Sequence, residues 1–209
     1  RYLNNSGIHK AYKLLRSFYK GSRILVFNKN LKAGYWSIPL AWEVDEAKLK
    51  SPEGKIIANY FRNPVEVMAN SCSFVGKIKK KELIKHLNYD KRRPTETLFH
   101  YRNQFRENIR EWGFSLPYNK VKKLPEGNYQ VSIKTKLQKK NMLCAYYKRK
   151  GVVKDTLLLA SHFDHPYQAN DGIAGSIAAF EVIKRLTKKT KLSYAALAAP
   201  EIVGSVFFA

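Results

Sequence analysis

The chain has 209 residues, of which 44% are hydrophobic, and it carries 39 Lys and Arg against 16 Asp and Glu, a formal net charge of +23. This length and hydrophobic content suffice to bury the core of one α/β domain with a small insertion, which excludes a wholly disordered protein. No apolar run reaches the ~18 residues that a membrane-spanning helix needs, so we expect no membrane partner.

The N-terminal segment has the pattern of a helix followed by a strand. Apolar residues recur at three- and four-residue spacing over residues 8–19, which predicts an amphipathic helix with Ser6 as its N-cap and Gly21 behind it. Residues 23–27 are predominantly apolar and predict a buried strand. A helix and then a strand are typical of the beginning of an α/β domain.

The pattern changes at about Gly34. Short strand-like pieces follow at residues 37–40, 41–44, 55–61 and 66–70, separated by turn residues such as Asn63 and Pro64. Short helices are predicted over residues 80–87 and 101–112. The sequence therefore predicts a small β-rich unit over residues 35–117.

The remainder of the chain alternates strands and a helix. Residues 128–137 and 142–147 predict two strands that form a hairpin, and residues 156–160 predict a central strand with both faces covered. Residues 173–186 predict a helix and residues 193–199 another buried strand, so a parallel pair joined by a right-handed crossover is expected.

These elements predict an α/β fold with a mixed, mostly parallel sheet and flanking helices, plus an inserted β-rich domain. We expect the peptidase-like part to be formed by residues 1–34 and 118–209, with residues 35–117 inserted between them.

Four side chains capable of binding a metal ion fall at the ends of the last two strands. His162 and Asp164 follow the first strand, Asp171 precedes the helix, and Glu201 follows the second strand. The carboxyl ends of parallel strands meet at the same edge of a sheet, which is where such sheets bind ligands. Because His, Asp and Glu together suit a borderline cation such as zinc, the sequence predicts a metal site there.

The spacing also indicates what each residue does. His162 can offer one ring nitrogen to the metal, while Asp164 holds the other nitrogen and fixes the tautomer. Asp171 can bridge two ions through its two oxygens, although a carboxylate at a helix start also acts as an N-cap. A single His or Glu after a strand is more often structural, so the prediction depends on the four residues occurring together.

The motifs that contain these residues resemble those of a known family. Ser161–Pro166, Ala169–Gly175 and Ala199–Ser205 are similar to the metal motifs of co-catalytic, two-zinc aminopeptidases of the bacterial leucyl aminopeptidase class. The chain resembles most closely a bacterial and archaeal branch of aminopeptidase-like proteins that carry an inserted β-rich domain. Further segments similar to that branch are Ser37–Pro39, Trp42, Pro52–Ile57, His100–Arg102 and Glu111–Phe114.

The resemblance implies specific roles. His162, Asp171 and Glu201 would be zinc ligands, with Asp171 bridging two ions, and Asp164 and Glu201 would serve catalysis. The family has two adjacent glutamates at the last position, the first being the general base, whereas this chain has Pro200 before Glu201. Either Glu201 takes the base role, or another group does, or the site binds metal without hydrolysis.

His165 lies outside the family motif. It is a candidate for contacting the substrate or for acting as an alternative ligand, and a structural role next to Pro166 is equally open. Because the chain begins with Arg and ends on an apolar segment, we expect both ends to be cut points, with the remaining ligands beyond Ala209 and the fragment alone inactive.

The predicted function is hydrolysis of a peptide or amide bond by metal-activated water, with a peptide or aminoacyl-type substrate. One alternative is a catalytically altered, metal-binding relative with a recognition role. A nucleic-acid-binding protein is a weaker alternative, because the basic residues are dispersed and no helix collects them. Cys72 and Cys144 form no disulfide pattern, so a reducing, cytoplasmic compartment is expected, and an oligomer is possible.

Overall fold

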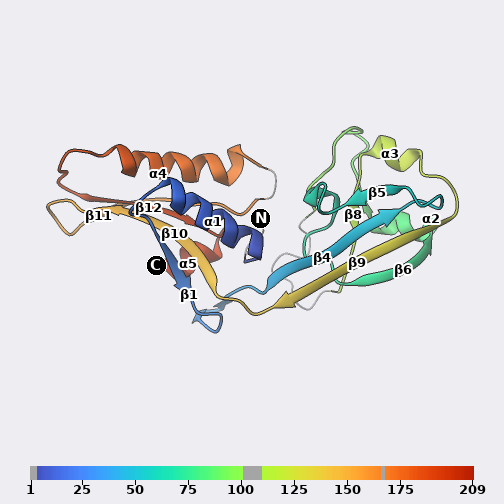
Figure 1. Ribbon diagram of the computed structural model, residues 1–209, viewed down its shortest axis with the longest axis horizontal. Coiled ribbons are helices and arrows are strands. Elements are labelled where there is room, and N and C mark those ends of the chain that lie inside the picture. Colours follow the sequence, from blue (N-terminus) through green and yellow to red (C-terminus); the bar gives the residue numbers. More distant parts are fainter. Residues whose placement is uncertain (1–3, 101–109, 166–167) are drawn as a thin grey trace. The chain divides into compact units, whose positions relative to one another are not determined.

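The computed structural model describes residues 4–100, 110–165 and 168–209, and the chain divides into two compact units (Figure 1). Unit 1 comprises Arg1–Ala41 and Gln138–Ala209, and unit 2 comprises Trp42–Leu137. The elements of unit 1 are α1 (Ser6–Phe18), β1 (Arg23–Phe27), β2 (Lys32–Ala33), β3 (Trp36–Ser37), β10 (Met142–Arg149), β11 (Thr156–His162), η3 (Asn170–Ala174), α4 (Gly175–Arg185), β12 (Ser193–Ala199) and α5 (Val203–Phe208).

Unit 1 contains a four-stranded mixed sheet in the order β1-β10-β12-β11. β11 and β12 are parallel and are joined through α4, which confirms the predicted parallel pair and its helical connection. β10 is antiparallel to both β1 and β12, so only one pair of strands in this sheet is parallel. The prediction of a mostly parallel sheet is therefore wrong. The mixed α/β fold with flanking helices is confirmed.

Helices cover both faces of this sheet. Alternate residues of β12 face opposite sides: Ala196 and Ala198 pack in a core with α1 and α4, whereas Leu197 packs in a core with Val203 of α5. The first core is closed by large side chains from both helices, among them Tyr12 and Phe180, which are fully buried. This packing explains why β12 is an uninterrupted apolar segment.

Unit 2 is the β-rich unit. Its elements are β4 (Ala41–Lys50), β5 (Ile56–Asn59), η1 (Pro64–Glu66), β6 (Phe74–Lys79), α2 (Lys80–Leu83), η2 (Ile84–His86), β7 (Leu87–Asn88), β8 (Phe114–Ser115), α3 (Tyr118–Lys122) and β9 (Asn128–Gln138). The main sheet has the order β5-β4-β9-β6. One of its faces is buried through alternate residues of the two central strands, Ala47, Leu49, Val131 and Ile133.

Several sequence predictions differ from the structure. β9 pairs with β6 in unit 2 and β10 pairs with β1 and β12 in unit 1, so the predicted hairpin between them is wrong. Because β9 belongs to the sheet of unit 2, residues 118–137 lie with the β-rich unit, whereas the sequence placed them in the peptidase-like part. Insertion of this unit into a peptidase domain stays a prediction.

Two local predictions also differ, and a third is largely untested. Residues 66–70 predicted a strand, but Glu66 ends the 3₁₀ helix η1. The N-cap of α1 is Asn5, whose side chain accepts a hydrogen bond from the Ile8 N–H at 3.0 Å, and not Ser6. The helix predicted over residues 101–112 lies largely outside the described residues.

We expect Glu66→Ala to lower the free energy of unfolding by about 1–3 kcal/mol, because Glu66 is a buried carboxylate with several donors. It accepts hydrogen bonds from the Asn59 N–H at 2.8 Å and from Arg62 Nη2 at 2.9 and 3.0 Å. Glu126→Ala is the matched control, since the Glu126 side chain is highly exposed and its 2.8 Å pair with Lys80 contributes ~0–0.5 kcal/mol. Urea denaturation measures both, and equal midpoints would contradict this account.

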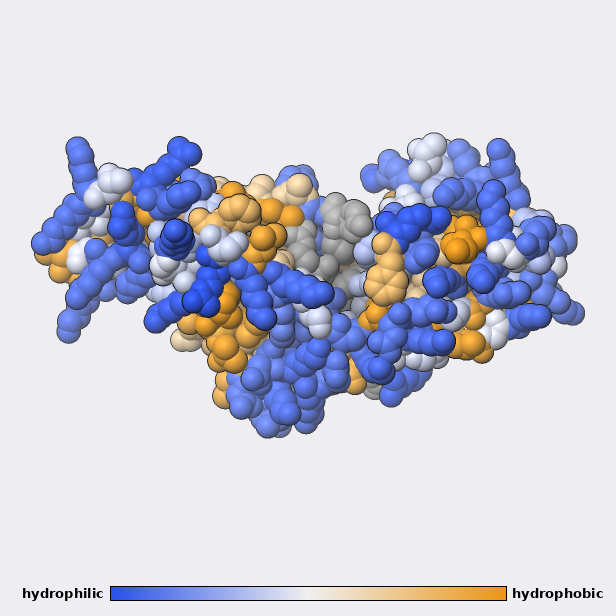
Figure 2. All heavy atoms as spheres, in the orientation of Figure 1, coloured by the Kyte–Doolittle hydropathy of each residue, from blue (hydrophilic) through white to orange (hydrophobic). Residues whose placement is uncertain are grey.

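Charged and polar side chains cover much of the face seen in Figure 2. Lys and Arg occur on helices and strands of both units, in agreement with a dispersed charge. Among the described residues, no helix is long and apolar enough to cross a membrane.

Candidate metal centre

The parallel pair β11–β12 positions the candidate site. His162, the last residue of β11, is in register with Ala199, the last residue of β12, and the Phe163 N–H donates to the Ala199 carbonyl oxygen at 3.0 Å. Both strands therefore end at the same level, and the segments that follow them leave the sheet side by side.

The turn before α4 brings Asp171 to this edge. Asp171 and Gly172 have non-helical backbone angles inside η3, and Gly172 has φ 94°. A Cβ atom at Gly172 would lie 3.2 Å from His162 Nδ1 and 3.1 Å from the His162 carbonyl oxygen. Glycine is thus required both for the left-handed conformation and for the close approach of the turn to the histidine.

Two histidines and a carboxylate meet at the strand ends. His162 Nε2 lies 3.0 Å from Asp171 Oδ1, and His165 Nε2 lies 3.6 Å from Asp171 Oδ2. The two imidazole rings are nearly perpendicular, with centroids 4.7 Å apart. Each oxygen of Asp171 thus faces a different histidine, and one ligand atom from each residue falls within 4.8 Å of the others.

Asp164 lies on the other side of the His162 ring. It is buried, its Oδ1 is 3.4 Å from His162 Nδ1, and the same oxygen accepts a hydrogen bond from the Glu201 N–H at 3.2 Å. Burial raises the pKa of the Asp164 carboxyl, and the Glu201 N–H and the two histidines oppose that shift. Because Nδ1 faces Asp164, the Nε2 atom of His162 is left to face Asp171.

Glu201 stands at the end of β12 in a tight turn. Its Oε2 lies 3.6 Å from His165 Nε2. The Val203 N–H donates to the Glu201 carbonyl oxygen at 2.7 Å across Ile202, which has φ 61° and ψ −69°. These are the features of a γ-turn with a left-handed central residue, which is costly for a β-branched side chain.

The carboxylates of unit 1 gather at this site. Residues 1–41 and 138–209 contain nineteen Lys and Arg and only five carboxylate side chains: Asp155, Asp164, Asp171, Glu181 and Glu201. Three of the five, Asp164, Asp171 and Glu201, contact His162 or His165. Such a concentration of carboxylates in a basic unit is what a bound cation would balance.

The donor set fits zinc. Imidazole nitrogen and carboxylate oxygen are ligands that zinc prefers, and two ligands ~2.0–2.1 Å from a tetrahedral ion lie about 3.3–3.4 Å apart. The observed separations of 3.0 and 3.6 Å about Asp171 bracket that value. On the far side of the ring, His162 Nδ1 lies 3.4 Å from the Asp164 carboxylate without forming a hydrogen bond, and a carboxylate on that side is the partner to which a zinc-binding histidine usually donates its second N–H.

A cavity of about 310 Å³ adjoins the cluster. His162 and Glu201 form part of its wall, and Ser161, Ile202 and Ser205 form another part. There is therefore room beside the cluster for a ligand group.

Sequence reasoning found four of the five side chains in this arrangement. His162, Asp164, Asp171 and Glu201 were predicted from their places at strand and helix ends, and the structure brings them together. His165 was left open, and the structure places it between Asp171 and Glu201. No spacing rule could assign it, because its position depends on how the chain turns after β11.

We expect Gly172→Ala to weaken zinc binding by about tenfold or more, because the added Cβ displaces either His162 or the Asp171 turn. Gly54→Ala is the matched control: it also has a left-handed backbone, φ 84°, but nothing within 4 Å of its Cβ position. Both variants should lose ~1–3 kcal/mol of stability, whereas only Gly172→Ala should change zinc affinity in a competition titration. Equal affinities would exclude the close approach as a requirement.

The chain is similar to known proteins in both units. Residues 41–136 match the model of a family described as a domain of unknown function, DUF2172. Over 212 aligned residues the chain is 28% identical to a Clostridium acetobutylicum protein assigned by inference to polysaccharide biosynthesis and described as having an aminopeptidase-like domain. That alignment covers 99% of this chain and 46% of the relative, so the chain spans about half the relative's length.

Solved structures show the same fold. The crystal structure of an inferred peptidase from Clostridium acetobutylicum superposes with a TM-score of 0.90 at 25% identity, covering 100% of this chain and 48% of that one. A zinc aminopeptidase from Bacillus subtilis has a TM-score of 0.66 at 12% identity, covering 100% and 60%, a likeness that shows the fold alone. The chain therefore has a peptidase-like fold and is similar in sequence to a protein described as having an aminopeptidase-like domain.

Proposed function

We propose that the protein containing this chain is a zinc-dependent aminopeptidase-like hydrolase that cleaves a peptide or amide bond. The observation that carries the proposal is the cluster of His162, His165 and Asp171, whose ligand atoms lie within 4.8 Å of one another at the carboxyl ends of two parallel strands. The likeness of the chain's fold to that of a zinc aminopeptidase supports the choice of zinc as the metal. The two free cysteines are consistent with a reducing, cytoplasmic compartment, which we include in the proposal.

The chain's own residues would divide the work. The Nε2 atoms of His162 and His165 and the two oxygens of Asp171 would hold zinc, with Asp171 shared between two ions. Asp164 would keep His162 in the tautomer that leaves Nε2 free, through its contact with Nδ1. Bound zinc would supply Lewis-acid chemistry, polarising a carbonyl and lowering the pKa of a water.

Glu201 is the proton acceptor in this proposal. It stands beside the cluster and borders the adjoining cavity, and its carboxylate is held near His165 rather than between His162 and Asp171. A carboxylate there would take a proton from the attacking water and return it to the leaving amine. It would do so without the second glutamate, since Pro200 precedes it.

The test is an assay of the full-length protein on a panel of aminoacyl-p-nitroanilides, with metal content measured alongside. We expect bound zinc and turnover that a chelator abolishes and added zinc restores. Zinc without turnover across the panel would favour the second candidate, a metal-binding relative with a recognition role, which Pro200 in place of a glutamate keeps open. Turnover that survives complete removal of the metal would contradict both.

A further inference from the structure

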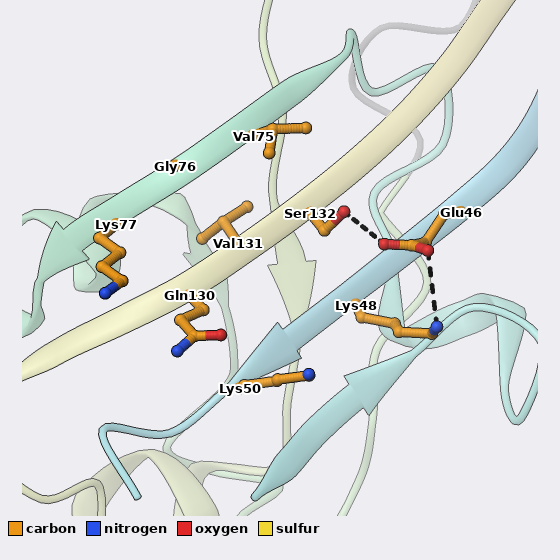
Figure 3. A pocket seen from close by; sticks show the side chains of 9 residues that line it. All are labelled: Glu46, Lys48, Lys50, Val75, Gly76, Lys77, Gln130, Val131 and Ser132. Carbon is orange, nitrogen blue, oxygen red and sulfur yellow. Dashed lines mark hydrogen bonds and ion pairs between the residues drawn. The ribbon is translucent and has the colours of Figure 1, made fainter. Parts of the chain in front are cut away.

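Unit 2 has an open groove on the face of its main sheet opposite the buried core (Figure 3). Its volume is about 440 Å³, and it runs over three adjacent strands, β4, β9 and β6. The lining residues are Glu46, Lys48, Lys50, Val75, Gly76, Lys77, Gln130, Val131 and Ser132. The residues of the metal centre belong to unit 1, and none of them is among the lining residues of this groove.

The three lysines of the groove lie on both sides of its central strand, two on one side and one on the other. Lys48 and Lys50 project from β4, and two residues along a strand span about 6.5–7 Å. Lys77 projects from β6 and is in register with Gln130 of the central strand β9. Because β9 lies between β4 and β6, Lys77 is about 10 Å across the sheet from the lysines of β4, with neutral polar side chains between them.

The groove has an excess of positive charge. Lys48 lies 3.6 Å from Glu46, the one carboxylate among the lining residues, whereas Lys50 and Lys77 form no ion pair with any residue that the structure describes. Ser132 donates a hydrogen bond to the Glu46 carboxylate (Figure 3). Cations on both sides of a channel attract an extended anion along the strand direction.

The polar side chains between the lysines form the floor of the groove, and they indicate that a ligand is recognised by hydrogen bonds as well as by charge. Gln130 offers an amide, Ser132 a hydroxyl and Glu46 a carboxylate, which together donate and accept hydrogen bonds. The Glu46 carboxylate is engaged by Lys48 and Ser132, and its remaining acceptor positions suit a ligand that itself carries hydrogen-bond donors. Such a floor favours an anion that bears hydroxyl groups over a bare polyanion such as polyphosphate.

Other polymers fit the groove less well. A peptide adds to a sheet through its main chain at a free strand edge, but the floor here is β9, a central strand paired on both sides. Single-stranded nucleic acid is held by stacking on aromatic side chains, and the described lining residues include neither an aromatic side chain nor Arg. The class of polymer that fits the groove best is therefore one whose hydroxyls and negative groups are bound by side chains.

We propose that this groove, the Lys48–Lys50–Lys77 groove, binds an anionic polysaccharide, with the lysines contacting its acidic groups and Gln130 contacting its hydroxyls. The exposed side chain of Val75 supplies an apolar surface at one end. The proposal does not depend on hydrolysis at the metal centre, and its test uses binding alone.

The test measures binding of a fluorescently labelled oligogalacturonate to the full chain by anisotropy. We expect binding that weakens with salt, and we expect the triple variant Lys48→Ala, Lys50→Ala and Lys77→Ala to lose about tenfold or more in affinity. The matched control removes the same charge from exposed lysines outside the groove, Lys120→Ala, Lys122→Ala and Lys123→Ala, and should change affinity by less than about threefold. Equal losses in the two triple variants would overturn the proposal, because binding would then follow net charge.

A second variant separates the glycan from other anions. We expect Gln130→Ala to weaken oligogalacturonate binding by at least about threefold and to leave binding of a poly-Glu peptide unchanged. All these substitutions are on the solvent face, so thermal unfolding should be unchanged. An unaltered glycan affinity in Gln130→Ala, or equally tight groove-dependent binding of poly-Glu or of single-stranded DNA, would overturn the assignment to a polysaccharide.

Discussion

Substitution of both His162 and Asp171 by Ala should abolish zinc binding by the protein. These residues supply the closest pair of opposed ligand atoms in the cluster, at 3.0 Å, and removing both leaves His165 as its one remaining ligand. Loss of a single supporting partner of a zinc ligand weakens binding 10–100-fold, so loss of two ligands should weaken it by more than about 100-fold. Zinc content after dialysis against a buffered zinc solution measures the effect.

The control for this variant is Asp155→Ala. Asp155 is an exposed carboxylate of the same unit, outside the cluster, so its removal changes the net charge without removing a ligand. We expect zinc content equal to that of the unsubstituted protein. Two zinc ions retained per chain in the double variant would refute the assignment of these residues as ligands.

The second large effect concerns Glu201. We expect Glu201→Gln to lower kcat by about 10²–10⁴-fold while zinc is retained, because the amide keeps the shape of the side chain but cannot accept a proton. Glu201 lines the cavity beside the cluster. Steady-state kinetics on the best p-nitroanilide, combined with metal analysis, separates loss of chemistry from loss of metal.

Glu181→Gln provides the matched control for Glu201→Gln. Glu181 is on α4 of the same unit, and it is paired with Arg185 at 3.2 Å, away from the cluster. Its substitution should leave kcat within about twofold, since surface pairs contribute little. A Glu201→Gln enzyme with full kcat would transfer the proton-accepting role to another group, and one that has lost its zinc would make Glu201 a ligand.

The sequence predicted strands more reliably than their partners. The bounds of β1 and β12 agree with the prediction residue for residue, because each is a short, largely apolar segment between clear breaks. The alternation in β9 also identified a strand, but periodicity carries no information on which strand it pairs with. The wrong hairpin prediction followed from that limit, and it placed residues 118–137 in the peptidase-like part rather than with the β-rich unit.

The site could be predicted further than the fold around it. His162, Asp164, Asp171 and Glu201 were found because residues at the carboxyl ends of parallel strands converge, whatever the details of packing. The roles depended on finer geometry: Asp171 reaches the ring of His162 only because Gly172 adopts φ 94°. His165 joins the cluster through the path of the chain after β11, which no local pattern specifies.

The central claim is that His162, His165 and Asp171 form a zinc site. The most direct test is the anomalous difference density at the zinc absorption edge in crystals of the full-length protein grown with zinc. We predict a peak about 2.0–2.2 Å from His162 Nε2 and from an oxygen of Asp171. Fully ordered His162 and Asp171 side chains without a peak between them, in the presence of saturating zinc, would contradict it.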